Sequence, residues 1–184
     1  MADATAGIGD QVKEAWNLVK PNLVTWIIAL IVGGLLSAFT LYLLLGPMQA
    51  GWTIMALKSK RGEKIEIGDL FKGFERFVDY LVIGLVGIIV PFGFLITTWA
   101  LPYCVDKKAP FMDSLKWGLA FFLKDIVGCI VAFVVAFVLI LVGEIACGIG
   151  VLVTAPIAIV YLNLFYLANE GKVPAGSEPA LPKT

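Results

Sequence analysis

The chain has 184 residues, of which 60% are hydrophobic and only 15% are charged, and its mean hydropathy is +0.93. Soluble domains carry about 25% charged residues, so this composition excludes an ordinary soluble fold and predicts an all-α, polytopic membrane protein. Fourteen basic residues balance fourteen acidic ones, so the net charge gives no indication of a nucleic-acid partner.

The N-terminal part predicts a tail, a surface helix and a first membrane span. Residues 1–9 form the tail, and residues 10–20 repeat apolar side chains with helical spacing, which predicts an amphipathic helix at the membrane surface. Residues 21–57 then lack any charged side chain, a run longer than one span needs. Gly46 and Pro47 mark the expected break, because proline cannot donate its backbone hydrogen bond. The piece after the break either completes a short crossing or re-enters.

The middle of the chain alternates polar and apolar stretches. Residues 58–77 are polar and end in a second amphipathic segment. Residues 78–105 form an apolar run that Pro91 interrupts, and residues 106–124 form the next polar band. This alternation predicts a second hairpin, provided that the amphipathic segment lengthens its first helix.

The longest apolar stretch, residues 126–169, has Glu144 as its only charged side chain. As one helix it would extend about 66 Å, about twice the thickness of the hydrocarbon core. We therefore expect two crossings, with the break at Gly148 and Gly150, where glycine relaxes the backbone. Residues 173–184 contain three prolines and no apolar periodicity, which predicts a disordered tail.

The distribution of basic residues predicts the topology. All fourteen lie in four bands between the apolar runs, at residues 13–20, 58–76, 107–124 and 172–183. If every apolar run is a hairpin, all four bands lie on one side, as the positive-inside rule requires. We therefore predict three helical hairpins of four to six membrane segments, with cytoplasmic amphipathic helices and both termini cytoplasmic.

An internal repeat is also predicted within a single membrane domain of residues 10–172. The pattern Asp-x-x-Lys opens the amphipathic segment before each hairpin, beginning at Asp10, Asp69 and Asp113. A proline, Pro47, Pro91 or Pro156, begins each returning half. These features predict three hairpin repeats, at about residues 10–64, 65–108 and 109–172. The alternative is that each Asp-x-x-Lys is only a helix cap followed by a surface charge.

Signals for catalysis are nearly absent from the sequence. The chain has no histidine, no nucleophile elbow, no phosphate-binding loop and no paired cysteine motif, so we predict no catalytic residue, metal or cofactor. Glu144 is the candidate functional acid, since an ionisable residue inside a membrane run is a functional hypothesis by default. Its position close to the predicted turn favours the alternative of a carboxylate at the water interface.

Small residues four apart predict helix-packing seams, because they allow close backbone approach in lipid. One seam comprises Gly128, Ala132 and Ala136, and a second comprises Gly33 and Ser37. Either seam serves intramolecular packing or a homodimer.

Several pieces resemble a family of uncharacterised bacterial integral membrane proteins. They are EAWNLVKPN (14–22), GPMQAG (46–51), GEKIEIGDLFKGF (62–74), VDKKAPFMDSLKW (105–117) and CGIGVLVTAPI (147–157). These pieces are similar to the YciC-like proteins and to the membrane domain of some glycerophosphodiester phosphodiesterases. The resemblance implies a bacterial inner-membrane location and several helical passes, and it transfers no catalytic residue.

Together these observations favour a non-enzymatic accessory or scaffold protein of a membrane assembly or of envelope organisation. Its expected partners are the lipid bilayer and, in addition, other membrane subunits or further copies of the chain. The alternative is a small channel or transporter for a solute or ion. That function requires a polar pathway built from the few scattered polar residues of the apolar runs, Gln49, Thr97, Thr98, Glu144 and Asn163.

Overall fold

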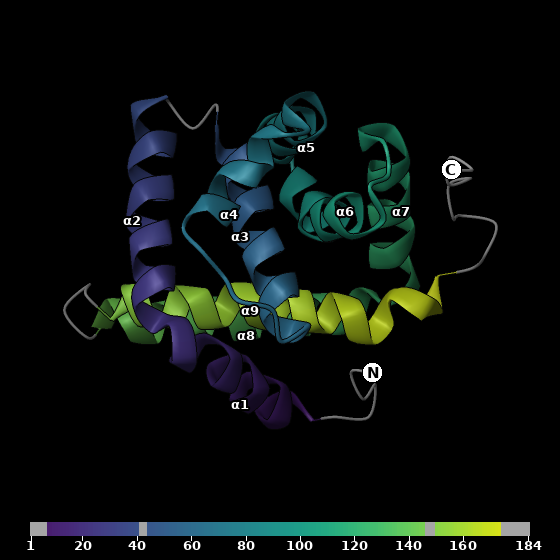
Figure 1. The fold of residues 1–184 in the computed structure, drawn as a ribbon. Helices are drawn as coiled ribbons and strands as arrows, with labels where there is room; N and C mark the ends of the chain where they lie inside the picture. The colour runs from purple at the N-terminus through teal and green to yellow at the C-terminus, as the bar shows by residue number, and fades with distance from the viewer. Residues whose placement is uncertain (1–6, 41–43, 146–149, 174–184) are drawn as a thin grey trace.

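The computed structural model describes residues 7–40, 44–145 and 150–173, and the elements within these ranges are helical, which confirms the all-α prediction (Figure 1). The predicted tails lie mostly outside the described ranges. The structure nevertheless differs from the prediction at one boundary of each tail. The first helix begins at Ile8, so it includes the end of the predicted N-terminal tail, and Val173 is buried although it was assigned to the C-terminal tail.

The first third of the chain forms three helices. Helix α1 (Ile8–Val19) continues through the short 3-10 turn η1 (Lys20–Asn22) into α2 (Leu23–Phe39), and α3 (Leu45–Lys60) follows. Helix α2 ends before the predicted break and α3 begins at Leu45, so Gly46 and Pro47 lie in the first turn of α3 and not between the helices. Backbone N–H groups of a first helical turn have no partner within the helix, so a proline there removes no helical hydrogen bond.

The second third contains short elements. Helix α4 (Gly68–Phe71) and the 3-10 turn η2 (Lys72–Phe74) precede α5 (Phe77–Ile89) and α6 (Gly93–Lys107). Pro91 lies in the turn between α5 and α6.

The last third contains α7 (Phe111–Lys124), α8 (Ile126–Ile145), α9 (Val151–Asn169) and the 3-10 turn η3 (Glu170–Lys172). The predicted break at Gly148 lies outside the described residues, and Gly150 directly precedes α9. Pro156 lies inside α9 and is not a hairpin break. An apolar helix tolerates such a proline where neighbouring elements pack around it, and Pro156 is buried here.

The helices form two crossing groups. Helices α8 and α9 lie side by side, and α2 and α3 run across them (Figure 1). An aromatic cluster fills the space between α6, α7 and α9, where the rings of Tyr103 and Trp117 stack with centroids 4.3 Å apart and Trp99 contacts Phe121 and Phe165. This core fixes α6 against α9.

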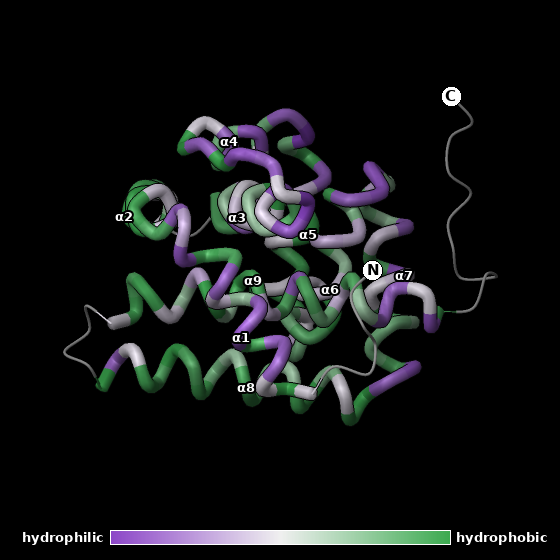
Figure 2. The backbone as a smooth tube through the Cα atoms, turned by 60° about the horizontal axis from the view of Figure 1, so that its bottom comes forward, coloured by the Kyte–Doolittle hydropathy of each residue, from purple (hydrophilic) through white to green (hydrophobic). Residues whose placement is uncertain are grey.

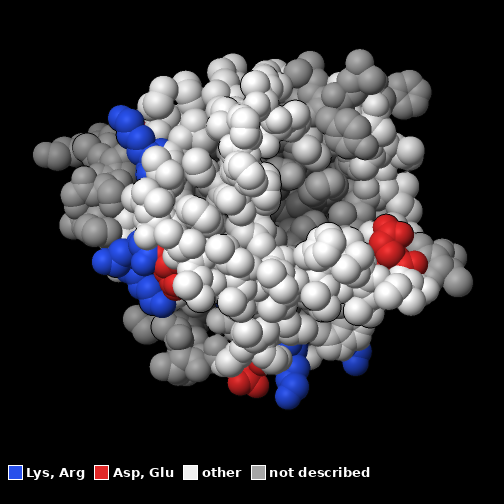
Figure 3. Space-filling view, turned by 180° about the vertical axis from the view of Figure 1, so that it is seen from behind, with Lys and Arg blue, Asp and Glu red and all other residues white. Residues whose placement is uncertain are grey.

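Apolar side chains also cover much of the outside. Figure 2 shows α8 as almost continuously hydrophobic, whereas hydrophilic residues gather around α4 and the ends of α1 and α7. Seen from behind, the molecule presents a broad face with charged side chains only at its margins (Figure 3). Within the described ranges, three helical stretches are long and apolar enough to cross a membrane: residues 8–38, 126–145 and 151–172.

The remaining apolar helices are shorter. Helices α3, α5 and α6 have 16, 13 and 15 residues. At about 1.5 Å per residue they extend about 20–24 Å, less than the ~30 Å of a hydrocarbon core. The middle hairpin is therefore the one whose crossing depends most on flanking segments.

Candidate functional site

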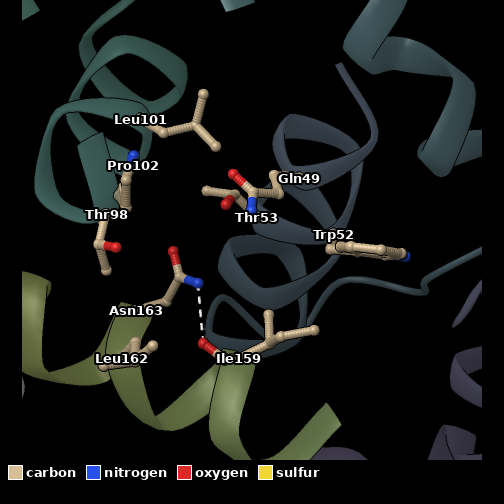
Figure 4. A pocket seen from close by; sticks show the side chains of 9 residues that line it. All are labelled: Gln49, Trp52, Thr53, Thr98, Leu101, Pro102, Ile159, Leu162 and Asn163. Carbon is tan, nitrogen blue, oxygen red and sulfur yellow. Dashed lines mark hydrogen bonds between the residues drawn. The ribbon is translucent and has the colours of Figure 1, made fainter. Parts of the chain in front are cut away.

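A pocket of about 170 Å³ lies between α3, α6 and α9 (Figure 4). It is formed where α3 packs against both other helices. Nine residues line it: Gln49, Trp52, Thr53, Thr98, Leu101, Pro102, Ile159, Leu162 and Asn163.

Each helix contributes two lining residues four positions apart. The pairs are Gln49 with Thr53, Thr98 with Pro102, and Ile159 with Asn163. Residues four apart lie on one face of a helix, so each helix turns a single stripe toward the pocket. All three stripes include polar side chains and place them in an otherwise apolar interior.

Asn163 is the most constrained polar group of the pocket. Its side chain is only 5% exposed, and its amide nitrogen donates a hydrogen bond of 2.9 Å to the carbonyl oxygen of Ile159. This bond fixes the orientation of the amide and turns the oxygen Oδ1 toward the space between Thr53 and Thr98 (Figure 4). Among the described residues Oδ1 has no hydrogen-bond partner.

Helix α6 supplies a second set of oxygen atoms. The Thr98 hydroxyl donates a 2.7 Å bond to the carbonyl oxygen of Phe94, which leaves its lone pairs as acceptors. Pro102 lies one turn later and has no N–H, so the Thr98 backbone carbonyl lacks its usual helical donor. Both residues line the pocket.

The rest of the lining is uncharged and mostly apolar. Trp52 donates its indole N–H to the Ala29 carbonyl oxygen at 3.2 Å, so this donor is already used. Leu101, Ile159 and Leu162 add aliphatic surface, and Gln49 is exposed. Among the described residues, no ionisable side chain lines the pocket.

Ion pairs connect the three lining helices at their polar ends. Arg61, directly after α3, pairs with Asp106 of α6 at 2.6 Å. Lys107 of α6 pairs with Glu170, directly after α9, at 3.0 Å. Lys60 of α3 also pairs with Glu14 of α1. These contacts hold the ends of α3, α6 and α9 together and so keep the pocket walls in place.

The structure brings together part of the predicted polar pathway. Gln49, Thr98 and Asn163 line one pocket, although they are far apart in the sequence. Thr97 is buried on another face of α6, against Gly87 of α5.

Glu144, the candidate functional acid, lies outside the pocket. It is exposed one residue before the end of α8, and the described residues offer it no ion pair. Within the described ranges no group of three or more His, Cys, Asp or Glu side chains could hold a metal ion.

The residues of the two predicted packing seams have different surroundings in the structure. Ala132 and Ala136 are buried in the core on α8, and Gly33 lies where a Cβ atom would be 2.8 Å from the Trp52 ring. Ser37 is 2% exposed, and its hydroxyl has no partner in the described part of the chain.

Gly128 lies in the first turn of α8, beside a helix cap. Its N–H donates a 2.8 Å hydrogen bond to the Asp125 carboxylate, and a Cβ atom at Gly128 would meet that carboxylate. The free N–H groups of a first helical turn attract such a carboxylate, so this end of the predicted seam also serves to cap α8.

Sequence reasoning missed Thr53 and Pro102. A signal was present, since polar or proline residues four apart in an apolar run share one helix face. The sequence did not indicate which faces meet, because that depends on the packing of α3 against α6 and α9.

Comparisons with known proteins give distant similarity. No family model matches the chain, and no solved structure matches it. Two uncharacterized proteins, from Mycobacterium bovis and Mycobacterium tuberculosis, are each 25% identical over 160 residues, which cover 80% of this chain and 49% of the relative. The chain thus spans about half the length of these curated relatives.

Proposed function

We propose that this chain is a non-enzymatic membrane protein that binds a small uncharged molecule in the pocket between α3, α6 and α9. The observation that carries the proposal is Asn163, whose buried carbonyl oxygen faces the pocket and has no partner in the part of the chain that the structure describes. Such an unsatisfied group costs about 1–3 kcal/mol, and a bound molecule recovers part of that cost. The channel or transporter alternative thereby gains a defined binding place, and we put it ahead of the scaffold function.

The size and charge of the pocket support this class of ligand. A buried engineered cavity of about 150 Å³ holds benzene, so a volume of about 170 Å³ has room for a molecule the size of one ring. An unpaired charge inside a membrane protein is costly, and the lining supplies no opposite charge. An uncharged molecule fits both conditions.

The predicted threefold repeat remains a proposal, and it accounts for the position of the pocket. Helices α3, α6 and α9 are the last helices of the three proposed units, residues 10–64, 65–108 and 109–172. The polar lining residues follow the three prolines by six, seven and seven residues: Thr53 after Pro47, Thr98 after Pro91, and Asn163 after Pro156. Membrane proteins built from repeats commonly hold their substrates at the repeat interface.

The cellular setting is proposed on sequence grounds. Three helical stretches of the described residues are long enough to cross a membrane, which supports a multi-pass protein. The arrangement of basic bands favours three hairpins with both termini cytoplasmic. The resemblance to YciC-like proteins and the distant similarity to mycobacterial proteins favour the bacterial inner membrane.

A scaffold function is the second candidate, and the outer face of α8 favours it. Along its whole length α8 exposes aliphatic side chains, including Val127, Val134, Val138 and Val142. This surface suits lipid or a helix of another membrane subunit. Native mass spectrometry from mild detergent distinguishes the two, because a copurifying subunit would promote the scaffold function.

Probe binding tests the pocket directly. The full chain is placed in nanodiscs and titrated with para-fluorophenol and para-fluoroanisole, two uncharged ring-sized probes, by fluorine NMR. We expect saturable binding of at least one probe. Thr98→Phe and, from the facing wall, Leu162→Trp should abolish it, because each substitution fills the pocket.

Glu144→Gln is the matched control, because Glu144 lies outside the pocket, and it should bind like the parent. If neither probe saturates, or if both filled variants bind as the parent does, the proposed function is rejected.

A further inference from the structure

Three lining residues already use a hydrogen-bond donor within the protein. The Thr98 hydroxyl donates to Phe94, and the Trp52 indole N–H donates to Ala29. The Asn163 amide nitrogen donates to Ile159. Each of these bonds points a donor at the backbone of its own or a neighbouring helix, and away from the pocket space.

The acceptors of the same residues remain free. Asn163 Oδ1 has no partner within the described residues, and Figure 4 shows it aimed into the space between the three helices. The Thr98 hydroxyl oxygen retains its lone pairs. The Thr98 backbone carbonyl has no helical N–H donor, because the residue four positions later is Pro102. Helix α9 therefore turns a free acceptor into the pocket, and the Thr98 hydroxyl oxygen of α6, which also lines the pocket, can accept a further hydrogen bond.

We infer that the ligand of this pocket is a hydrogen-bond donor: a small, largely apolar, uncharged molecule with an O–H or N–H group that donates to Asn163 Oδ1. This inference rests on the proposed function and specifies its ligand class. The apolar body lies against Trp52, Leu101 and Leu162, and the donor group lies toward Asn163 and Thr98.

The apolar part of the lining disfavours binding of a strongly polar solute. Five of the nine lining residues are apolar: Trp52, Leu101, Pro102, Ile159 and Leu162. A solute with donors on every side would leave several of them unpaired against this surface, and each unpaired donor disfavours binding. One donor group on an apolar frame pairs with the acceptors and leaves no such group.

A matched pair of probes tests the inference. Para-fluorophenol carries an O–H donor, and para-fluoroanisole has a methyl ether in its place. For the full chain in nanodiscs we expect para-fluorophenol to bind about tenfold more tightly, the effect of one hydrogen bond to an otherwise unpaired acceptor. Asn163→Leu removes the acceptor at similar volume and should reduce this preference to about twofold or less.

Asn169→Leu is the matched control. Asn169 lies on the same helix, is also buried, and donates to the carbonyl four residues earlier, but it does not line the pocket. This variant should keep the full preference of the parent. Because the readout is a ratio between two probes, general loosening of α9 affects both and leaves it unchanged.

The outcomes separate the two proposals. If both probes saturate the pocket with equal affinity, or if Asn163→Leu keeps the preference for para-fluorophenol, the donor inference is overturned while pocket binding stands. If neither probe saturates, pocket binding and the donor inference both fail.

Discussion

Asp69 is the most deeply buried ionised group outside the apolar helices. Its side chain is 3% exposed and pairs with Lys58 at 2.8 Å and with Lys72 at 2.7 Å, and its carboxylate also accepts the Glu66 N–H. Burial raises the pKa of this carboxyl, but hydrogen bonds from Lys58, Lys72 and Glu66 together lower it below the ordinary value of 3.8. The carboxylate thus joins the end of α3 to α4 and η2.

Asp69→Asn should lower the melting temperature of the detergent-solubilised protein at pH 7, at a cost of about 1–3 kcal/mol for two lysines left without their partner. A group whose pKa is lowered by folding stabilises above its unfolded pKa, and this contribution is lost as the pH falls through the lower folded pKa. The difference between parent and variant should therefore shrink below about pH 3.8. The exposed Asp10→Asn is the control, and a pH-independent difference would contradict the ion-pair account.

At the scale of elements, glycines decide how closely α3 approaches its neighbours. A Cβ atom on Gly46 would overlap the backbone carbonyl of Tyr80 in α5. A Cβ atom on Gly84 would lie 2.6 Å from the Gly46 Cα atom, so the two backbones touch. Gly51 makes a similar approach to the backbone of Leu70. Contact of this kind holds helices together where lipid removes the hydrophobic driving force.

Gly46→Ala should therefore separate α3 from α5 and destabilise the protein by about 1–3 kcal/mol, as overpacking does in a close-packed interior. Gly34→Ala is the matched control, since a Cβ atom there meets nothing within 4 Å. It should leave the melting temperature unchanged or raise it. Equal melting temperatures for the parent and Gly46→Ala would show that α3 and α5 are not in backbone contact.

The sequence predicted the individual helices better than it predicted which helices pack against each other. Long apolar runs predicted the helices, and a run of 44 residues predicted the α8–α9 hairpin, because length and composition are local properties. Pro156 was wrongly assigned to a break, because local propensity did not reveal that packing buries it within α9. The pocket was predicted only as scattered polar residues, since Gln49, Thr98 and Asn163 meet through tertiary packing.

At the scale of the whole molecule, ion pairs and exposed apolar side chains lie in different places. The ion pairs of Lys60, Arg61 and Lys107 gather at the C-terminal ends of α3, α6 and α9, and Lys60 reaches Glu14 in the middle of α1. The turns at the other ends, by contrast, expose large apolar side chains such as Ile89, Phe92 and Ile145. The ion pairs involve residues from three of the four basic bands of the sequence, which the positive-inside rule predicts to lie on one side of the membrane.

Cysteine labelling tests this orientation in a background from which the native cysteines are removed. Glu63→Cys and Lys116→Cys occupy exposed positions in two basic bands and should resist an impermeant thiol reagent in intact cells, because the positive-inside rule predicts that these bands are cytoplasmic. Ile145→Cys, which is 84% exposed at the end of α8, should react. Ile89→Cys, 71% exposed at the end of the short α5, reports on the middle hairpin and should also react if that hairpin crosses with its flanking segments.

Labelling at Glu63→Cys or Lys116→Cys from outside would rule out three hairpins. Protection at Ile89→Cys alone would mean that α5 and α6 do not cross, and that the pocket is built partly from a hairpin held within the membrane by α3 and α9.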